Sequence, residues 1–215
     1  MKIIAIDGPS GSGKGTIAKE VAKRLNYTYV DTGAMYRCVS LMSLKNNIGE
    51  KEEDKIVDLL KNMDIKLTND GKVFLNNEDV SDEIRTIEVT HRVSKISSII
   101  PLREVMREKQ REMATKDNIV MEGRDITTEV FPDADVKIYL DASVEERANR
   151  RYKQNQEKGI ECTYDEIKDA IIERDYDDTH RPVGSLTRTD EQTYIDSSNM
   201  TIEEVINKIL ELVGE

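Results

Sequence analysis

A glycine-rich segment near the amino end constrains the fold of this 215-residue chain more than any other feature. It runs from Gly8 to Thr16 and has glycine at four of its nine positions. The apolar run before it, residues 2–7, is typical of a buried parallel strand. The apolar residues after it share one face of a helix: Ile17, Ala18, Val21, Ala22 and Leu25. The sequence therefore predicts a strand, a glycine loop and a helix, in that order.

The residues of this loop favour phosphate binding. Glycine has no Cβ that would block a phosphate, so successive backbone N–H groups can turn inward and surround it. The start of the following helix adds partial positive charge. The spacing Gly8-x4-Gly13-Lys14 fits the P-loop motif, whose lysine reaches the outer phosphates of a nucleoside triphosphate. Lys14 is therefore a candidate catalytic residue, and the predicted nucleotide-binding residues are Gly8, Pro9, Ser10, Gly11, Ser12, Gly13, Lys14, Gly15 and Thr16.

One position of the loop departs from the motif. Gly15 follows Lys14 where a P-loop has Ser or Thr, and Thr16 comes one residue later. The hydroxyl that usually binds Mg²⁺ is thus displaced, and we expect phosphates, water and a carboxylate elsewhere to hold the metal. Glu122, which follows the apolar run 118–121, is the candidate carboxylate, acting through water.

Composition narrows the classes of partner. The net charge is −11, which argues against a nucleic-acid or anionic-membrane surface because such partners require a basic field. The apolar runs are strand-length, well short of the ~20 residues that span a bilayer, and the opening residues lack a signal-peptide pattern. We therefore expect a cytoplasmic protein, with Cys38 and Cys162 reduced.

Further strands and helices alternate along the chain and predict an α/β fold with a five-stranded parallel sheet. The predicted strands are 2–7, 27–31, 118–121, 136–141 and 193–196. A helical run from Glu88 to Thr115 is expected to break near Pro101. Three capping boxes are predicted to open later helices: Ser143-x-x-Glu146, Thr163-x-x-Glu166 and Thr201-x-x-Glu204. The last of these helices is expected to pack Ile202, Val205, Ile206, Ile209, Leu210 and Val213 onto the sheet.

Two segments depart from this alternation. Residues 46–98 contain a charged helix and then two short alternating runs around Asn69-Asp70-Gly71, a pattern that predicts an antiparallel hairpin in an inserted subdomain. Residues 147–188 are rich in arginine and predict a helical arm that closes over the site, with a polar, mobile stretch at 154–161. In its second helix, Ile167, Ala170 and Ile171 are expected to face inward. The core is then assigned to residues 1–45, 99–142 and 190–215.

Arginine and acidic residues are predicted to gather at the sheet edge that carries the glycine loop. The segments 31–37 and 122–125 each follow a strand, and open α/β sheets bind ligands at that edge. Arg37 and Arg124 can each grip a phosphate with two N–H groups. Arg147 and Arg151 lie one helical turn apart, so both can lean over one anion. Holding two phosphates in line and neutralising the charge between them is what phosphoryl transfer requires.

The chain resembles the bacterial cytidylate kinases, which are P-loop nucleoside monophosphate kinases, over essentially its whole length. The resemblance rests on several motifs in one order: residues 6–16, 31–37, 79–86, 122–125, 130–134 and 173–175. It implies a three-layer fold with an NMP-binding insert and a helical LID. It also implies an enzyme that uses Mg²⁺ and transfers the γ-phosphoryl group of ATP to CMP or dCMP, giving ADP and CDP or dCDP in pyrimidine nucleotide metabolism. We expect a monomer.

The resemblance also assigns roles to individual residues. Arg37 and Arg124 would hold the acceptor phosphate in a pocket lined by Thr32 and Tyr36. The implied cytosine readers are Ser94, Arg103 and Asp125, the implied sugar contacts Asp178 and Arg181, and the implied LID arginines Arg147, Arg150, Arg151 and Arg174. Cytosine O2 and N3 accept hydrogen bonds and its amine donates one, which suits Ser and Arg donors and an Asp acceptor. Uracil would leave the Asp without a donor, which disfavours UMP.

Two residues differ from the family pattern, which often has Asp at the position of Glu122 and Ser at the position of Thr32. The longer Glu side chain changes the geometry of the metal site, whereas the Thr keeps its hydroxyl. Two other functions stay open from the residues: a P-loop kinase for UMP or a hydroxylated metabolite, and a nucleotide-binding switch. The sequence lacks the Asn-Lys-x-Asp motif that is typical of guanine-nucleotide switches, which argues against the switch.

Overall fold

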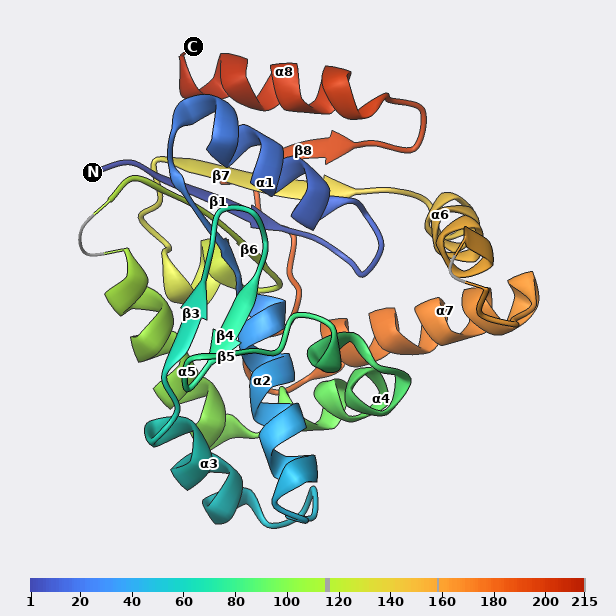
Figure 1. The fold of residues 1–215 in the computed structure, drawn as a ribbon. Coiled ribbons are helices and arrows are strands. Elements are labelled where there is room, and N and C mark those ends of the chain that lie inside the picture. Colours follow the sequence, from blue (N-terminus) through green and yellow to red (C-terminus); the bar gives the residue numbers. More distant parts are fainter. Residues whose placement is uncertain (115–116, 158, 215) are drawn as a thin grey trace.

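A parallel sheet forms the centre of the molecule (Figure 1). The computed structural model describes residues 1–114, 117–157 and 159–214. Within them, five parallel strands lie in the order β2-β6-β1-β7-β8. Their bounds are β1 Ile3–Asp7, β2 Thr28–Asp31, β6 Ile119–Gly123, β7 Val136–Asp141 and β8 Thr193–Asp196. The predicted α/β class and the five predicted strands are confirmed.

Helices cover the sheet on both sides. On one side, α1 (Lys14–Leu25) and α8 (Ile202–Val213) pack together over an apolar cluster that includes Ile4, Ile6 and Ile138. On the other side, the end of α5 (Ile100–Met113) and a π-helical turn, η2 (Ile126–Val130), cover Ala5 and Met121.

The prediction for α8 is correct except at two positions. Val205, Ile206, Ile209 and Val213 are buried, Leu210 is half-buried, and Ile202 is 58% exposed. Ile202 is the first residue of the helix and lies beyond the edge of the apolar cluster.

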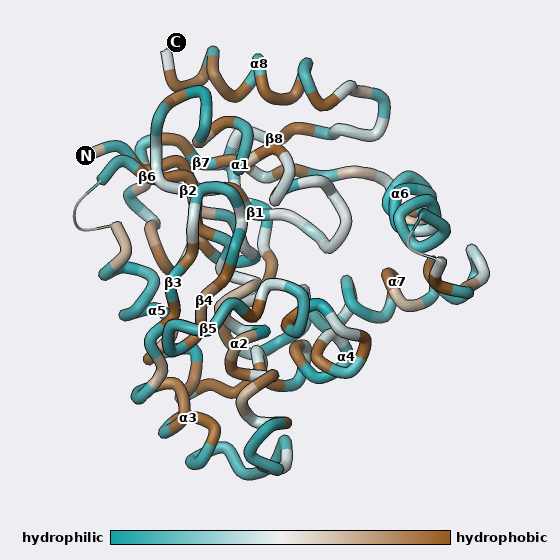
Figure 2. The backbone as a smooth tube through the Cα atoms, in the orientation of Figure 1, coloured by the Kyte–Doolittle hydropathy of each residue, from teal (hydrophilic) through white to brown (hydrophobic). Residues whose placement is uncertain are grey.

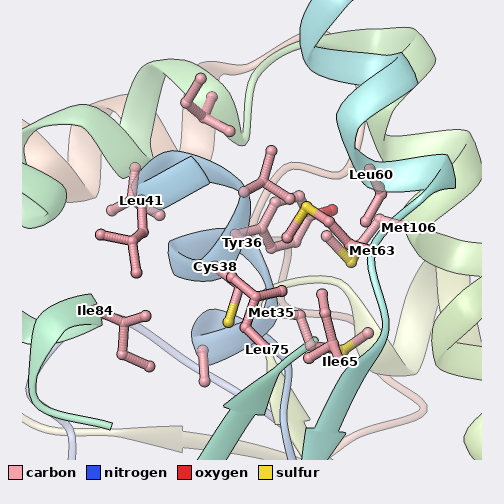
Figure 3. Close-up of a cluster of buried hydrophobic side chains, with 14 of the residues drawn as sticks. Met35, Tyr36, Cys38, Leu41, Leu60, Met63, Ile65, Leu75, Ile84 and Met106 are labelled. Carbon is pink, nitrogen blue, oxygen red and sulfur yellow. The ribbon is translucent and has the colours of Figure 1, made fainter. Parts of the chain in front are cut away.

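Residues 46–98 contribute to a second apolar core, which they share with two helices outside this segment (Figure 3). The segment contains α3 (Glu53–Lys61), β3 (Ile65–Leu67), β4 (Val73–Leu75), β5 (Glu78–Asp79), η1 (Glu83–Arg85) and α4 (Ile87–Ile96), packed against α2 (Thr32–Lys45) and α5. The predicted hairpin is confirmed, with Ile65 opposite Leu75. Strand β5 was not predicted, because its two residues are exposed acids without apolar alternation. In Figure 2, hydrophobic residues, coloured brown, recur along α2, β3 and β4, which contribute to this core.

The helical run after residue 87 breaks where the proline predicts. Helix α4 ends at Ile96, and α5 begins at Ile100 with Pro101 in its first turn, where a missing N–H costs nothing. The described part of α5 ends at Met113, and Thr115, the predicted end of the run, lies outside the described residues.

The arm after β7 consists of α6 (Val144–Glu157) and α7 (Tyr164–His180), which pack together through a small cluster around Ala148. Residues 154–157, predicted to be mobile, continue α6 as a helix because no proline or glycine interrupts them. Helix α7 continues six residues beyond Arg174, and Ala170, predicted to face inward, is exposed. Figure 1 shows this arm projecting from the end of the sheet.

Two of the three predicted capping boxes are present, at Thr163 and Thr201. The third is wrong in one half. The Glu146 N–H donates to Ser143 Oγ at 3.2 Å, but the Glu146 carboxylate binds Arg150 and the Ser143 N–H donates to Ser198. The guanidinium of Arg150, one turn later, forms a stronger, charged hydrogen bond with the Glu146 carboxylate than the backbone N–H of Ser143 would.

The remaining expectations concern the two cysteines and membrane-spanning helices. Cys38 and Cys162 form no disulfide. No helix among the described residues has the length and apolar character that a bilayer crossing requires.

Candidate active site

The glycine loop joins β1 to α1 at the carboxyl edge of the sheet. A Cβ at Gly8 would lie 2.0 Å from the carbonyl oxygen of Leu140, so only glycine lets the loop leave the sheet this close to β7. Gly13 has a φ of +95°, which side-chain-bearing residues rarely adopt, and it immediately precedes the first turn of α1. The sequence therefore shapes the backbone of this loop mainly through its glycines.

Lys14 lies inside the loop rather than at the surface. Its side chain is 5% exposed, and Nζ donates to the Pro9 carbonyl oxygen at 2.8 Å. Burial, followed by the positive charge of Arg124, lowers the pKa of Lys14 to about 7. An anion bound in the loop would reverse this shift, because a nearby negative charge favours the ammonium form.

Glu122 faces Lys14 from the end of β6, the strand next to β1. A Cβ at Gly15 would lie 3.2 Å from Glu122 Oε1, so the glycine at this unusual motif position leaves room for the longer acid. The Tyr29 hydroxyl donates to Oε1 at 3.5 Å. Burial, followed by the charge of Asp31, raises the pKa of Glu122 to about 7.

This raised pKa predicts a pH-dependent stability. The folded chain keeps a proton on Glu122 between its ordinary pKa of 4.5 and about 7, where the unfolded chain has released it. The stabilisation is complete below about pH 4.5 and is lost as the pH rises through about 7. The melting temperature of the wild type, relative to a Glu122→Gln variant, should therefore fall across that window in thermal melts. A constant or rising difference would contradict the assignment.

A cavity of about 500 Å³ lies between the loop, the strand ends and the insert. It brings together residues that are far apart in the sequence. Those of the predicted site that line it are Ser10, Gly11, Gly13, Lys14, Gly15, Thr16, Thr32, Tyr36, Arg37, Arg103, Glu122, Arg124, Asp125, Arg151, Arg174, Asp178 and Arg181. A neighbouring cavity of about 1620 Å³, between the insert and the arm, is lined by others: Ser12, Ser94, Arg147 and Arg150. Gly8 and Pro9 line neither cavity, and Gly8 instead lies against Leu140.

Asp178 is the centre of an arginine cluster in the smaller cavity. Its side chain is 2% exposed, Oδ2 accepts from Arg124 Nε at 2.6 Å, and Oδ1 accepts from Arg181. Arg174 Nε lies 3.9 Å from Oδ2. Burial opposes ionisation of Asp178, but the charges of Arg124, Arg181 and Arg174 outweigh it and hold its pKa below the ordinary value. One carboxylate thus holds three guanidinium groups in one place, a strongly cationic surface for an anion.

Arg174 has spare capacity for such an anion. Its Nε is buried and makes no hydrogen bond within the described part of the chain. Burial, followed by the charge of Arg124, lowers the pKa of Arg174 to about 10. A bound phosphate would oppose this lowering of the pKa, because a nearby negative charge favours the charged guanidinium.

Arg103 and Asp125 form a buried pair that lines the same cavity. Arg103 Nη2 donates to Asp125 Oδ2 at 2.6 Å, and Nη1 donates to the Ser97 carbonyl oxygen at 2.7 Å. The guanidinium lies 5.5 Å from the ring centre of Tyr36, whose pKa burial raises to about 12. A Cβ at Gly184 would lie 2.0 Å from Arg103 Nη2, so glycine lets the segment after α7 cover this pair.

Thr32 and Arg37 both come from α2. The Thr32 hydroxyl donates to the Glu122 carbonyl oxygen at 2.7 Å, and so holds the start of α2 against the end of β6. Arg37 Nη1 donates to Thr90 Oγ1 at 2.7 Å and to the Ile84 carbonyl oxygen at 3.2 Å, which directs the guanidinium across the insert.

Ser94 and Ser97 differ in position although both lie near the end of α4. Ser94 lines the larger cavity, and its hydroxyl donates to Asp177 of α7 at 3.2 Å. Ser97, which sequence analysis did not select, lines the smaller cavity, and its hydroxyl accepts from Arg181 at 3.4 Å. The spacing of three residues places both serines on one side of the helix, and this spacing could have identified Ser97 from the sequence.

The arginines of α6 divide into two kinds. Arg147, 3% exposed, binds Asp175 through Nη1 at 3.0 Å and Nη2 at 2.6 Å, and also donates to the carbonyl oxygens of Ala142 and Ser10. Arg150 donates to carbonyl oxygens of the loop and of the segment after β8. Arg151 has no ion-pair or hydrogen-bond partner among the described residues and lines both cavities. Arg147 and Arg151 therefore share a helix but face different surroundings.

Solved structures of related fold support the architecture. An uncharacterised protein from Eubacterium ventriosum superposes with a TM-score of 0.54 at 12% identity, covering 100% of this chain and 99% of that chain. Shikimate kinase from Bacteroides thetaiotaomicron gives a TM-score of 0.51 at 15% identity, with the same coverage. At these identities the likeness concerns the fold alone.

Sequence relatives are much closer. A model of the cytidylate kinase family matches residues 4–215. Cytidylate kinase of Leuconostoc mesenteroides is 46% identical over 213 residues, which make up 98% of this chain and 95% of the relative. Cytidylate kinase of Fusobacterium nucleatum is 48% identical over 207 residues, or 96% and 94% of the two chains. The chain therefore belongs to the cytidylate kinase family and is a phosphotransferase that acts on cytidylate.

Proposed function

We propose that the chain transfers the γ-phosphoryl group of ATP to CMP or dCMP across the smaller cavity. The observation that supports this most is that Lys14, Glu122 and the Asp178 arginine cluster line one cavity at adjacent strand ends. The loop from Gly8 to Thr16 would hold the phosphates of ATP, and Lys14 would neutralise charge on the transferred group. The enzyme supplies positioning and charge, so no side chain has to act as a nucleophile.

The acceptor roles divide the cavity into three regions. Arg37 and Arg124 would hold the CMP phosphate beside Thr32 and Tyr36. Asp178 and Arg181 would face the sugar. Arg103 and Asp125 would read cytosine, because a guanidinium donates to O2 and N3 whereas a carboxylate accepts from the amine. Ser94 is also assigned to the cytosine edge, although it lines the neighbouring larger cavity. Ser97 lines the smaller cavity, so its hydroxyl is better placed to contact cytosine.

The closing arm supplies the remaining positive charge. Arg151 and Arg174 would reach the phosphates, since both line the smaller cavity and have unused N–H groups among the described residues. We assign Arg147 and Arg150 to the same catalytic surface, where their bonds to loop carbonyl oxygens would set its shape. Residues 46–98 would act as the NMP-binding insert and 147–188 as the LID, which excludes water and so limits hydrolysis of ATP. The core is residues 1–45, 99–142 and 190–215. Residues 115, 116, 158 and 215 of these ranges lie outside the described structure.

Magnesium fits the donors that are present. Glu122 presents a carboxylate beside Gly15, and Thr16 adds a hydroxyl at the cavity wall. The described residues contain no group of three or more His, Cys, Asp or Glu side chains placed to hold a metal ion. This suits an ion that binds mainly to phosphates and water, with Glu122 orienting a water ligand. The ion would neutralise phosphate charge when it is bound.

We also propose that the chain works as a monomer in the cytoplasm, without nucleic acid. The net charge of −11 supports the absence of a nucleic-acid surface, and the two free cysteines suit a reducing compartment.

An acceptor screen tests the proposed function. With ATP and Mg²⁺ in a coupled ADP-release assay, we expect kcat/KM for CMP and dCMP to exceed that for UMP by about 10²-fold or more, because UMP leaves the Asp125 carboxylate without a donor. Equal or greater activity with UMP would overturn the cytosine assignment. Binding of ATP that no monophosphate alters would favour a nucleotide-binding switch instead.

A further inference from the structure

We propose that Asp7, Thr127 and Gln192 form a buried positioning network that fixes the turn carrying Arg124 and Asp125. The proposal rests on the acceptor-binding function proposed above for those two residues. The three side chains are 0%, 3% and 8% exposed, and none of them lines either cavity. They can therefore affect the acceptor only through the backbone that they hold.

Asp7 connects the glycine loop to the acceptor turn. It is the last residue of β1, directly before Gly8. Its Oδ1 accepts from the Ile126 N–H at 2.9 Å, and its Oδ2 accepts from the Thr127 N–H at 2.8 Å and from the Thr127 hydroxyl at 2.6 Å. These donors follow Asp125 immediately. One carboxylate therefore links the strand that ends in the phosphate loop to the turn that presents Arg124.

Gln192 extends this link to the segment that returns from the arm. Its Nε2 donates to the Thr127 hydroxyl, which in turn donates to Asp7. Nε2 also donates to the Thr187 carbonyl oxygen at 3.3 Å, and Oε1 accepts from the Thr189 N–H at 2.7 Å. The Thr127 hydroxyl thus has both a donor and an acceptor on different segments, and it is the junction of the network.

The cost of burying Asp7 argues for a positioning role. No described Lys, Arg or His lies within ion-pair distance of it, and burial raises its pKa to about 6 against the opposing effect of its hydrogen bonds with Thr127 and Ile126. A buried acid without a charged partner stabilises a fold less than an apolar side chain of similar size would. Its hydrogen bonds do, however, fix the geometry of the backbone that follows Asp125. Losing one of them would leave a buried polar group without a partner, which is costly.

Variants at the junction test the proposal. Thr127→Val keeps the shape but removes both hydroxyl bonds, and Thr127→Ser keeps the hydroxyl. Loss of a hydrogen bond to a charged group should raise the KM for CMP about tenfold in Thr127→Val, with the KM for ATP unchanged within about twofold. Thr127→Ser should resemble the wild type. Thr128→Val is the matched control, because the neighbouring Thr128 makes no side-chain hydrogen bond to the described residues.

Asp7→Asn should also raise the KM for CMP, because the amide NH₂ of Asn would face a group that donates to Asp7 in the wild type, such as the Thr127 N–H. If Thr127→Val lowers the melting temperature but leaves the KM for CMP unchanged, or raises both KM values together, the network has no positioning role. An Arg124→Ala variant measured in parallel separates the two proposals. If Arg124→Ala raises the KM for CMP and Thr127→Val does not, only the network is wrong, whereas an unchanged KM in Arg124→Ala overturns the acceptor assignment itself.

Discussion

Replacing Lys14 with alanine should lower kcat by about 10²–10³-fold, because one preorganised donor at the developing charge commonly contributes that much. The side chain is buried and already directed into the loop, with Nζ 2.8 Å from the Pro9 carbonyl oxygen. Its removal takes away a buried cation that is costly to desolvate, so we expect the folded state to be no less stable. The measurement is kcat in an ADP-release assay, with a thermal melt on the same sample.

A control on the same helix isolates the effect of position from that of charge. Lys23 lies on the exposed side of α1, 3.9 Å from Glu20, where a surface ion pair contributes little. Lys23→Ala should therefore match the wild type in kcat. Near-normal turnover of Lys14→Ala, or an equal loss in both variants, would refute the role assigned to Lys14.

The parts of the fold that sequence analysis predicted correctly depend on local pattern. The strands at Ile3–Asp7 and Val136–Asp141 are apolar runs of strand length, and the hairpin has Gly71 between alternating residues. The break at Pro101 follows from the missing N–H of one residue. Such signals need no knowledge of distant contacts.

The parts that were missed depend on contacts between distant segments. Glu146 was expected to cap its helix but binds Arg150, and Arg147 meets Asp175, which lies 28 residues later. Helical spacing alone predicted that Arg147 and Arg151 face one anion, whereas a half-buried acid on α7, Asp175, binds the first of them. The positions of Ser94 beside Asp177 and of Ser97 beside Arg181 likewise depend on where α7 lies, and the role of Ser94 in reading cytosine stays a prediction.

Replacing Arg124 with alanine should lower kcat/KM for CMP by about 10²-fold, mainly through KM, because a hydrogen bond between charged groups contributes about 1.5–3 kcal/mol. The KM for ATP should change little, because we assign Arg124, which follows β6 and lines the cavity, to the acceptor phosphate. The same substitution removes a partner 2.6 Å from Asp178, a carboxylate that is almost fully buried. We therefore expect a lower melting temperature as well. The decrease should be limited, because Asp178 keeps its bond to Arg181.

A second substitution separates lost binding from lost stability. In Arg124→Gln the neutral side-chain amide can still donate to the Asp178 carboxylate, so the melting temperature should recover towards the wild type. The KM for CMP should stay high, because the phosphate contact is still missing. Arg124→Lys should recover only part of the affinity, since an ammonium cannot bridge Asp178 and a phosphate as a guanidinium fork can. If Arg124→Gln recovers affinity along with stability, or if Arg124→Ala weakens ATP and CMP equally, Arg124 supports the fold rather than the acceptor.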